Sequence, residues 1–451
     1  MSDLAVPAAA TTRRHVTGLW LLAVALVISV ATYAMAGLGL KGRAPRDIVV
    51  YGVVFSAAFV AGWLVVRWTA PRADPVLFPT ATALAGLGIA MLYRIMVARG
   101  DSTVAREQAI WLIVGIAAFC LTLWVIRDDR QLNAYTYTLG LVGVALLLLP
   151  VVPGIGREIN GARLWAQVGP FSFQPAEFGK IFIVVFLAAY LTDKQELLAA
   201  GAGRFGMPRA KDLGPLLLAW GASLAVLFRE RDLGASLLFF GVFVVMLWVA
   251  SGRATYLWIG LVLFAVGAWV GYLVFDHVQG RVDTWLHALD PDKVTGQGYF
   301  QLAQGWFAMA TGGIVGTGLG QGSPTLIPYV GSDFIFAAFG EELGMIGAVA
   351  LLLLYLILIA RGLRIAMERT DTFGKLLATG LTTILALQTF AIVAGVTRLI
   401  PLTGVPLPLV SYGGSSRVAT FIMLALLIRV SSGPMTRPSP VKSRPRERAR
   451  G

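Results

Sequence analysis

The composition of the chain is that of an integral membrane protein. The sequence has 451 residues, of which 57% are hydrophobic and only 14% are charged, whereas a soluble domain usually carries about 25% charged residues. This balance excludes a soluble globular protein. The net charge of +13 does not indicate nucleic acid as a partner, because many basic residues lie between apolar runs or in the C-terminal tail, where Lys and Arg set membrane topology. A single cysteine, Cys120, excludes an intrachain disulfide, and with three histidines a zinc site is not expected.

Apolar runs along the chain predict about twelve membrane-spanning helices and therefore an all-helical fold. A helix needs about 20 apolar residues to cross a bilayer. The continuous runs do not suit a β-barrel, whose strands alternate in polarity over about ten residues. The first run is too long for the core of a cleavable signal peptide and is interpreted as the first span. The spans are expected near residues 16–38, 48–67, 77–97, 108–126, 133–153, 178–192, 214–228, 233–251, 254–276, 333–360, 374–397 and 408–430.

Basic residues predict that both termini are cytoplasmic. Arg13 and Arg14 precede the first span, and a run of Lys and Arg follows the last, which is the distribution typical of cytoplasmic segments. An even number of spans places both ends on the same side of the membrane. Residues 1–15 are therefore expected to form a cytoplasmic N-terminal segment, and the Pro- and Arg-rich residues 431–451 a disordered basic cytoplasmic tail.

Two long connections are expected on the outer side of the membrane, at residues 154–178 and 276–332. Loops longer than about 15 residues are commonly functional. The second connection contains the acidic turn Asp290-Pro291-Asp292, a moderately apolar stretch over residues 301–310 and a glycine-rich segment. This pattern predicts an exposed turn, a re-entrant or interfacial helix and a tightly folded glycine segment. At membrane depth, such irregular backbone must be covered by protein or line a wet cavity.

Ionisable residues gather at the edges of the spans, nearly all toward the outer side. Because charge near the membrane is costly, these side chains are expected to face a cavity or to pair with each other. Arg and Lys could hold a diphosphate, and Asp290 or Asp292 could act as a general base on a hydroxyl. The residues alone fit transfer from a diphosphate-linked lipid and equally a transporter with an acidic cation site, and no nucleotide-binding motif is present. The edge residues are Arg157, Glu158, Arg163, Glu177, Lys180, Arg229, Glu230, Arg231, Asp232, Asp333, Glu341, Glu342 and Arg398.

Six ordered motifs carry a resemblance to a known family. They are Asn160-Gly161-Ala162-Arg163-Leu164-Trp165, Gln174-Pro175-Ala176-Glu177-Phe178-Gly179-Lys180, Arg231-Asp232-Leu233-Gly234, Gly298-Tyr299-Phe300-Gln301, Ser332-Asp333-Phe334-Ile335-Phe336-Ala337 with Glu341-Glu342-Leu343-Gly344, and Pro401 to Pro408 followed by Ser411 to Ser416. On these motifs the chain resembles the SEDS family of shape, elongation, division and sporulation proteins, the RodA, FtsW and SpoVE group of peptidoglycan glycosyltransferases. Within this family it looks most like the actinobacterial RodA-like members.

The resemblance implies a transmembrane domain at residues 16–430, which consists of two additional N-terminal helices at 16–67 and a ten-span core with the catalytic outer loop at 277–332. It implies polymerisation of lipid II, a disaccharide-pentapeptide on undecaprenyl diphosphate, into β-1,4-linked glycan strands at the outer face of the cytoplasmic membrane during cell elongation. The essential aspartate of the family lies in an Asp-Pro motif, so the role of general base in an inverting reaction is carried to Asp290. Asp292 remains the alternative, because the spacing from the Asp-Pro pair to Tyr299 looks longer than usual.

The other site roles are hypotheses that rest on the same resemblance. Glu177 and Asp333 are expected to orient the basic residues or to bind a divalent cation, Mg²⁺ or Mn²⁺. A purely structural pair between Glu177 and a lysine one helical turn away fits equally well. The expected partners are lipid II, the membrane and a class B penicillin-binding transpeptidase. The residues expected to bind the substrate diphosphates are Arg163 and Lys180, with Arg231 and Arg398 as weaker candidates.

Rival functions remain open from the sequence. A lipid II flippase would need the same cavity and cations but no general base. A secondary transporter would place its site at the membrane midplane between broken helices, and a non-enzymatic scaffold would tolerate the loss of Asp290. A division-type, FtsW-like polymerase is the alternative to the RodA-like assignment within the same family.

Overall fold

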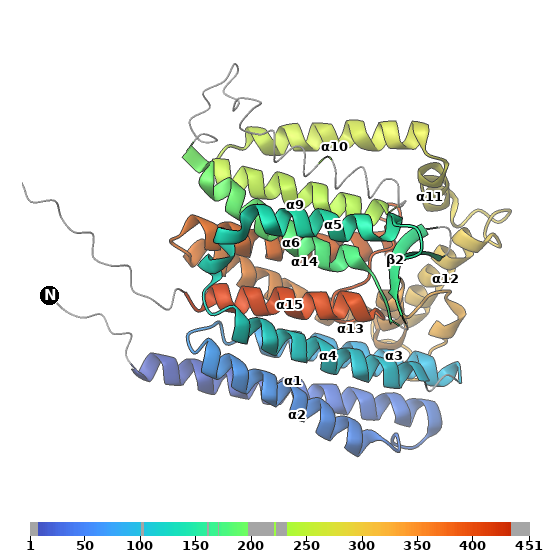
Figure 1. The fold of residues 1–451 in the computed structure, drawn as a ribbon. Coiled ribbons are helices and arrows are strands. Elements are labelled where there is room, and N and C mark those ends of the chain that lie inside the picture. Colours follow the sequence, from blue (N-terminus) through green and yellow to red (C-terminus); the bar gives the residue numbers. More distant parts are fainter. Residues whose placement is uncertain are drawn as a thin grey trace, which may run out of the picture.

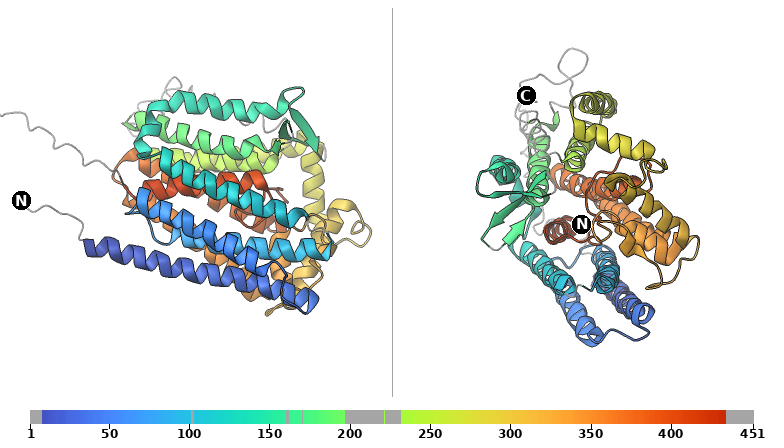
Figure 2. Two further views of the ribbon diagram at one scale, coloured as in Figure 1. Left: turned by 60° about the horizontal axis from the view of Figure 1, so that its bottom comes forward. Right: turned by 90° about the vertical axis from the view of Figure 1, so that its right-hand side faces the viewer.

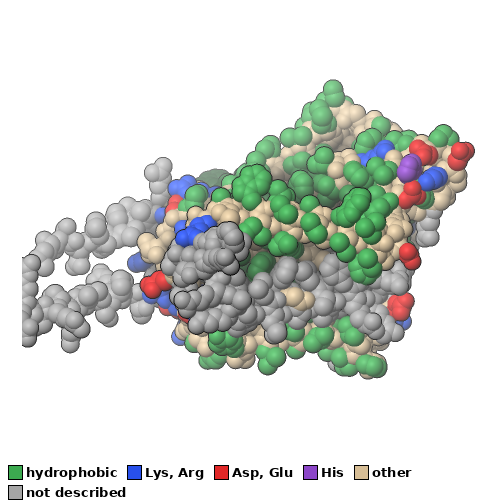
Figure 3. Space-filling view, turned by 90° about the horizontal axis from the view of Figure 1, so that it is seen from above, with side chains coloured by type: hydrophobic (Ala, Val, Ile, Leu, Met, Phe, Trp, Pro, Cys, Tyr) green, Lys and Arg blue, Asp and Glu red, His purple; other side chains and the backbone are tan. Residues whose placement is uncertain are grey.

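Long helices that run side by side make up most of the structure, a computed structural model that describes residues 8–100, 103–159, 162–169, 171–196, 221 and 232–433 (Figure 1). Among these residues, 11 helical segments are long and apolar enough to cross a membrane. On the face shown in Figure 3, hydrophobic side chains dominate along the helices and charged side chains lie toward the ends. The spanning segments are α1 (Ala8–Lys41), α2 (Ile48–Thr69), α3 (Leu77–Ala98), α4 (Thr103–Val125), Asp129–Val151 around α5 (Thr136–Leu148), α6 (Pro175–Asp193), α9 (Leu233–Ser251), α10 (Thr255–Val274), α13 (Ile335–Glu368), α14 (Thr372–Val396) and α15 (Gly414–Ser431).

Each expected span that the structure describes contains a helix, although α13 runs on to Glu368 and the last span becomes helical only at Gly414. The span predicted at 233–251 coincides with α9. The span predicted at 178–192 begins earlier, at Pro175, because proline is well suited to the first turn of a helix. The seventh span, expected near 214–228, lies outside the described residues except for Gly221, and so does the tail beyond Gly433.

Four helices form the centre of the bundle. In α3, α6, α14 and α15, between 72% and 83% of the most apolar window is buried inside the protein, compared with 11% in α10 and 17% in α2. The end-on view in Figure 2 places the blue N-terminal helices at one edge of the bundle. Because α2 and α10 bury little of their apolar surface against the protein, they present it outward to lipid.

The first two helices form a hairpin that reaches the second outer segment. Tyr33 of α1 stacks on Tyr51 of α2 with ring centroids 4.0 Å apart, and its hydroxyl donates to Asp47 at 2.8 Å. Near the end of α1, the backbone carbonyl of Gly39 accepts a hydrogen bond of 2.7 Å from Nε2 of Gln321. The hairpin therefore supports the glycine-rich part of the outer segment.

Replacing Gly39 with alanine is expected to loosen this support. A β-carbon at position 39 would overlap the carbonyl oxygen of Leu319, so α1 and the outer segment would have to separate, at about 1–3 kcal/mol of stability. Gly52→Ala in α2 is the matched control, because a β-carbon there meets only Val30, at 3.7 Å, and alanine favours the helix. Thermal unfolding of both purified variants should show a loss for Gly39→Ala alone. Equal unfolding temperatures would contradict the close contact.

The first outer segment folds into a three-stranded antiparallel sheet, which the all-helical prediction did not include. Its strands are β1 (Gly156–Ile159), β2 (Ala162–Val168) and β3 (Phe171–Phe173), in the order β1-β2-β3. In β2 the buried Ala166 precedes the exposed Gln167, the alternation of a sheet covered on one side. Strands this short leave no clear signal in a hydropathy pattern. The chain continues from this sheet directly into α6.

The second outer segment holds two helices rather than one. Helix α12 (Gln297–Gly312) confirms that residues 301–310 are helical. Helix α11 (Asp276–His287) has no counterpart in the sequence prediction, because its residues are mostly polar and form no apolar run. Both helices lie beyond the ends of the spanning helices, at the right-hand side of Figure 1.

Gly344 interrupts α13 and lets the glycine-rich segment dock on it. Its φ of +66° lies in the left-handed region, which glycine adopts at little cost. The interruption leaves the carbonyls of Glu341 and Glu342 free to accept hydrogen bonds from the backbone N–H groups of Thr317 and Gly318, both at 3.0 Å. The expected tight fold of the glycine segment against protein is confirmed.

Candidate active site

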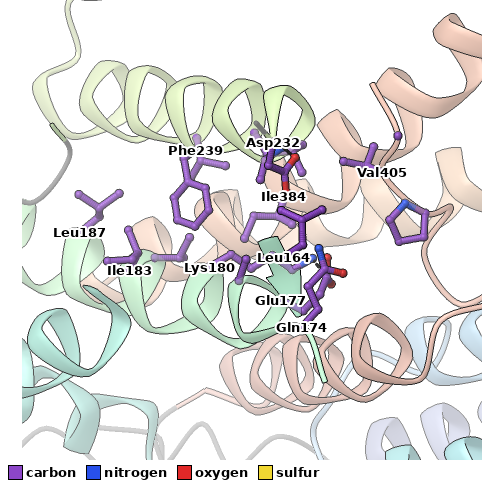
Figure 4. A pocket seen from close by; sticks show the side chains of 17 residues that line it. Leu164, Gln174, Glu177, Lys180, Ile183, Leu187, Asp232, Phe239, Ile384 and Val405 are labelled. Carbon is purple, nitrogen blue, oxygen red and sulfur yellow. Dashed lines mark hydrogen bonds and ion pairs between the residues drawn. The ribbon is translucent and has the colours of Figure 1, made fainter. Parts of the chain in front are cut away.

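A cavity between α6, α9 and α14 brings together charged residues from distant parts of the chain (Figure 4). The space at this site, which includes the part that is open to solvent, amounts to about 610 Å³. Its charged lining residues are Glu177, Lys180 and Asp232, and the remaining wall is largely apolar, with Leu164 of β2 and residues 404–406 among its members. A mostly apolar wall with a few convergent polar groups is typical of ligand sites.

Glu177 and Lys180 form a buried ion pair on α6. Nζ of Lys180 lies 2.7 Å from Oε2 of Glu177 and donates a second hydrogen bond, of 3.1 Å, to Oε1 of Gln388. Nε2 of Gln388 in turn donates to the carbonyl of Pro406 at 2.9 Å. The pairing expected from the one-turn spacing is present. Because both charged side chains also line the cavity, an anionic ligand there would meet the lysine directly.

Asp232 caps α9 at the cavity wall. Its Oδ1 accepts a hydrogen bond of 2.8 Å from the backbone N–H of Ala235, which is the contact of an N-cap residue. Burial raises the pKa of the Asp232 carboxyl, against the lowering effects of this hydrogen bond and of the charge of Arg281. The sequence marks Asp232 as an edge charge and as part of a family motif but gives it no site role, since its place in the cavity depends on how α6 and α9 pack.

Arg281 of α11 connects the outer loop with the cavity. Its Nη1 donates to the carbonyl oxygens of Leu402 and Thr403, each at 3.0 Å. Burial lowers the pKa of the guanidinium, while the charges of Asp232 and Asp333 raise it. Asp333 is half-buried, and loss of solvation raises the pKa of its carboxyl. Sequence reasoning missed Arg281 because it gave no sign of α11.

The aspartate expected to act as general base lies in the turn between α11 and α12. The backbone N–H of Asp290 donates to the carbonyl of His287 at 3.1 Å, and its carbonyl accepts from the N–H groups of Lys293 at 3.0 Å and Val294 at 2.9 Å. The Asp290 side chain is half-buried, whereas that of Asp292 is exposed. Neither carboxylate forms a hydrogen bond or an ion pair with any residue that the structure describes.

A third aspartate, Asp283, braces this loop. It accepts hydrogen bonds from Oη of Tyr299 and from Nζ of Lys293, the latter at 3.1 and 3.2 Å, and its Oδ1 lies 2.8 Å from Nδ1 of His287. The Tyr299 hydrogen bond first, and then those from Lys293, hold the pKa of Asp283 below its usual value. A carboxylate stabilised in its charged form is a poor proton acceptor. Asp283 therefore suits a structural role in the loop.

The other predicted site residues are only partly brought together. Arg163 lies in β2, next to the cavity residue Leu164, and Arg231 lies outside the described residues. Asp333 and Arg398 are not among the residues that line the cavity.

Comparisons with known proteins identify relatives along nearly the whole chain. The family model of the FtsW, RodA and SpoVE group, described as cell cycle protein, matches residues 75–434. The chain is 45% identical to the peptidoglycan glycosyltransferase RodA of Mycobacterium tuberculosis, over 99% of this chain and 96% of that protein. It is 44% identical to the RodA of Mycobacterium leprae, over 96% and 93%. A probable peptidoglycan glycosyltransferase FtsW of Geobacter metallireducens is 33% identical over 80% and 95%.

Solved structures share the fold. A chain from a structure on the coordination of polymerization and crosslinking by a peptidoglycan synthase complex has a TM-score of 0.64 at 29% identity, covering 80% of this chain and 97% of that chain. The rod shape determining protein RodA of Thermus thermophilus has a TM-score of 0.56 at 27% identity, covering 81% and 98%. With the family model matched over residues 75–434, the chain belongs to the SEDS family of peptidoglycan glycosyltransferases, the group of FtsW, RodA and SpoVE.

Proposed function

We propose that the chain polymerises lipid II into β-1,4-linked glycan strands at the outer face of the cytoplasmic membrane, as a RodA-like peptidoglycan glycosyltransferase of cell elongation. The observation that carries this assignment is 45% identity, over 99% of the chain, to a protein named peptidoglycan glycosyltransferase RodA. Identity to a probable FtsW is 33% over 80% of the chain. The mycobacterial relative also aligns across α1 and α2, whereas the family model begins at residue 75. This supports a ten-span core with two added N-terminal helices.

In this proposal both termini are cytoplasmic and the loop that carries Asp290 faces outward. The described start of α1 and end of α15 lie at the same end of the bundle (Figure 1). Cytoplasmic ends of spans are enriched in Lys and Arg. Basic residues at this end of the described helices are Arg14, Arg67, Arg72, Arg361, Arg364 and Arg369.

The proposed reaction is a single displacement at the donor sugar. The 4-hydroxyl of the acceptor GlcNAc attacks C1 of the donor MurNAc, and Asp290 accepts the hydroxyl proton as the new oxygen–carbon bond forms. The bond between C1 and the diphosphate oxygen breaks, and undecaprenyl diphosphate leaves with the bonding electrons. An in-line displacement inverts C1, which gives the β-1,4 link. Asp292 is the alternative base.

The substrate diphosphates are proposed to enter the cavity beside Lys180. Ammonium and guanidinium groups form strong hydrogen bonds to phosphate oxygens, and Lys180 already donates to Glu177 and Gln388, which hold it in place. Arg163 and Arg231 remain further candidates, because they neighbour the cavity residues Leu164 and Asp232 in the chain. Glu177 would then orient the lysine between substrate turnovers.

A divalent cation, Mg²⁺ or Mn²⁺, is proposed to take part only together with the substrate. There, no group of three or more carboxylate, imidazole or thiol side chains comes together as metal ligands, and Glu177 is already paired with Lys180. The described residues therefore offer no cluster of three such ligands, and the steps above use no ion. We propose that a cation, where one takes part, arrives on the substrate diphosphate.

A transpeptidase is the proposed partner. One structure that resembles this chain comes from a peptidoglycan synthase complex that coordinates polymerization and crosslinking. Strands made by a polymerase alone carry uncrosslinked peptides, so a crosslinking enzyme must act on this product. We assign that role to a class B penicillin-binding transpeptidase.

The test of the function is a gel assay of glycan polymer from pure lipid II. The detergent-purified chain is assayed alone and with the candidate transpeptidase, and polymer is expected in at least the second case. Protein that binds lipid II but forms no polymer under either condition would instead favour a flippase.

Replacing Lys180 with methionine is expected to raise the KM for lipid II about 10-fold or more. Loss of a charge-assisted hydrogen bond costs about 1.5–3 kcal/mol, and 1.4 kcal/mol corresponds to a factor of ten. Steady-state polymerisation over a range of lipid II concentrations measures the effect. Lys194→Met, at the opposite end of α6, is the matched control. The double variant Glu177→Gln/Lys180→Met removes the unpaired buried carboxylate. If it recovers both stability and KM, the lysine is structural and does not bind substrate.

A further inference from the structure

The C-terminus of α11 is held by an arginine that is distant in the chain. The last carbonyls of a helix have no partner within the helix, and a cation at this end also offsets the helix dipole. Arg398 donates from Nε to the carbonyl of Trp285 and from Nη2 to that of Leu286, both at 2.7 Å. The next carbonyl, that of His287, accepts from the backbone N–H of Asp290 at 3.1 Å. Arg398 therefore fixes the helical turn from which the proposed base extends.

Arg398 keeps a strained backbone to make these contacts. Its φ is +60°, in the left-handed region that non-glycine residues rarely adopt. Its carbonyl accepts a hydrogen bond of 2.9 Å from Nε1 of Trp285, and its guanidinium lies 5.6 Å from the ring centre of Trp306 in α12. Strain of this kind persists where the surroundings determine the conformation, and it clusters at functional sites.

A second arginine makes the reciprocal contact. Arg281 lies one helical turn before Trp285, on the same face of α11, and donates to the carbonyls of Leu402 and Thr403. The chain then continues directly into residues 404–406, which line the cavity with Lys180. We name residues 398–406 the bracket. The bracket contacts α11 at one end and forms part of the cavity wall at the other.

We propose that Arg398 is a positioning residue for glycosyl transfer. Through the bracket, it holds the Asp290 loop at a fixed position relative to the cavity. The proposal rests on the proposed function, in which Asp290 is the base and the diphosphate lies beside Lys180. In this role Arg398 acts on the position of the base rather than on substrate, because its Nε and Nη2 donate to carbonyls of α11. A displacement of about 1 Å in a catalytic group can cost roughly 100-fold in rate, so a loosened α11 should slow the chemical step more than it weakens binding.

Arg398→Gly is the decisive variant, because glycine adopts the same φ without strain while every guanidinium contact is lost. Initial rates of polymerisation over a range of lipid II concentrations are expected to show kcat lowered about 10–100-fold with KM changed by less than about threefold. Arg398→Lys keeps the charge but cannot bridge two carbonyls as the planar guanidinium does. Its kcat should lie between those of the wild type and Arg398→Gly. Arg364→Ala, an exposed arginine paired with Glu368, is the control with unchanged rates.

The outcomes separate this proposal from the proposed function. A higher KM at unchanged kcat would show that Arg398 binds the diphosphate, as the sequence suggested, and would overturn the positioning role. Full activity of Arg398→Gly, in an assay where Asp290→Asn is inactive, would reject the proposal and leave the function standing. If no wild-type polymer forms, it is the function that fails. If Arg398→Gly does not fold, Trp285→Phe is tested instead, because it removes the hydrogen bond from the indole to the Arg398 carbonyl. Trp285→Phe must then also lower kcat, and an unchanged kcat would reject the proposal.

Discussion

Asp290→Asn is expected to abolish detectable glycan polymer while binding of lipid II survives. Asparagine keeps the shape of the side chain but cannot take a proton at neutral pH, and a positioned general base contributes about 10²–10⁴-fold to a rate. The half-buried Asp290 carboxylate has no hydrogen-bond partner among the described residues, so the substitution leaves no buried donor unpaired. The gel assay from pure lipid II, with and without the transpeptidase, measures the loss.

Two neighbouring aspartates provide the controls for this result. Asp292→Asn changes an exposed side chain two residues away and is expected to retain polymerisation. Asp283→Asn weakens the contacts to Tyr299, Lys293 and His287, and a partial loss is expected because the loop loses its brace. Loss of polymer with Asp292→Asn alone would keep the enzyme but move the base by two residues. Wild-type rates from all three variants would show that none of these aspartates is the base.

The spanning helices could be predicted from the sequence because lipid imposes a simple rule. Every backbone polar group in the bilayer core must be satisfied within its own helix, so each span leaves a continuous apolar run. The run over 233–251 coincides with α9 for this reason. Helix α11 obeys no such rule, since it lies beyond the spans and is fixed by contacts with Arg398 and residues 402–403. Its existence depends on tertiary structure.

In the candidate site, too, local contacts could be predicted from the sequence and contacts between distant segments could not. Glu177 and Lys180 could be paired from the sequence because they lie one helical turn apart. Asp232 and Arg281 could not be connected, because the cavity and the bracket bring together segments that are distant in the chain. The role of Arg398 was equally hidden. An arginine at a span edge predicts a charged partner, whereas here its partners are backbone carbonyls at the end of a helix.

Arg94→Met is expected to have the largest effect on stability, about 3–5 kcal/mol. Nε of Arg94 lies 2.6 Å from Oε1 of Glu342, and the two side chains are only 3% and 0% exposed. Removing the arginine leaves a buried carboxylate without its counter-charge, which is the costly way to break such a pair. Natural domains are stable by about 5–15 kcal/mol. Thermal unfolding of the detergent-purified protein should therefore show a large fall in unfolding temperature.

A second ion pair on α13 is the matched control. Arg364 lies 2.6 Å from Glu368, but the two side chains are 59% and 61% exposed, and an exposed pair one helical turn apart contributes about 0.3–0.5 kcal/mol. Arg364→Met should therefore leave the unfolding temperature nearly unchanged. Equal losses from Arg94→Met and Arg364→Met would show that burial is not the cause.

The double variant Arg94→Met/Glu342→Met tests whether this pair stabilises the helices or shapes the outer segment. Replacing a buried pair by apolar side chains is often neutral for stability, so the unfolding temperature should largely recover. The glycine-rich segment should not regain its native conformation, because it loses two hydrogen bonds. Nη2 of Arg94 donates to the carbonyl of Gly322 at 2.7 Å, and Oε2 of Glu342 accepts from the N–H of Gly320 at 2.9 Å. A stable double variant with a low polymerisation rate would assign the pair to the outer segment. A stable variant with the wild-type rate would show that glycosyl transfer does not depend on how this segment is held.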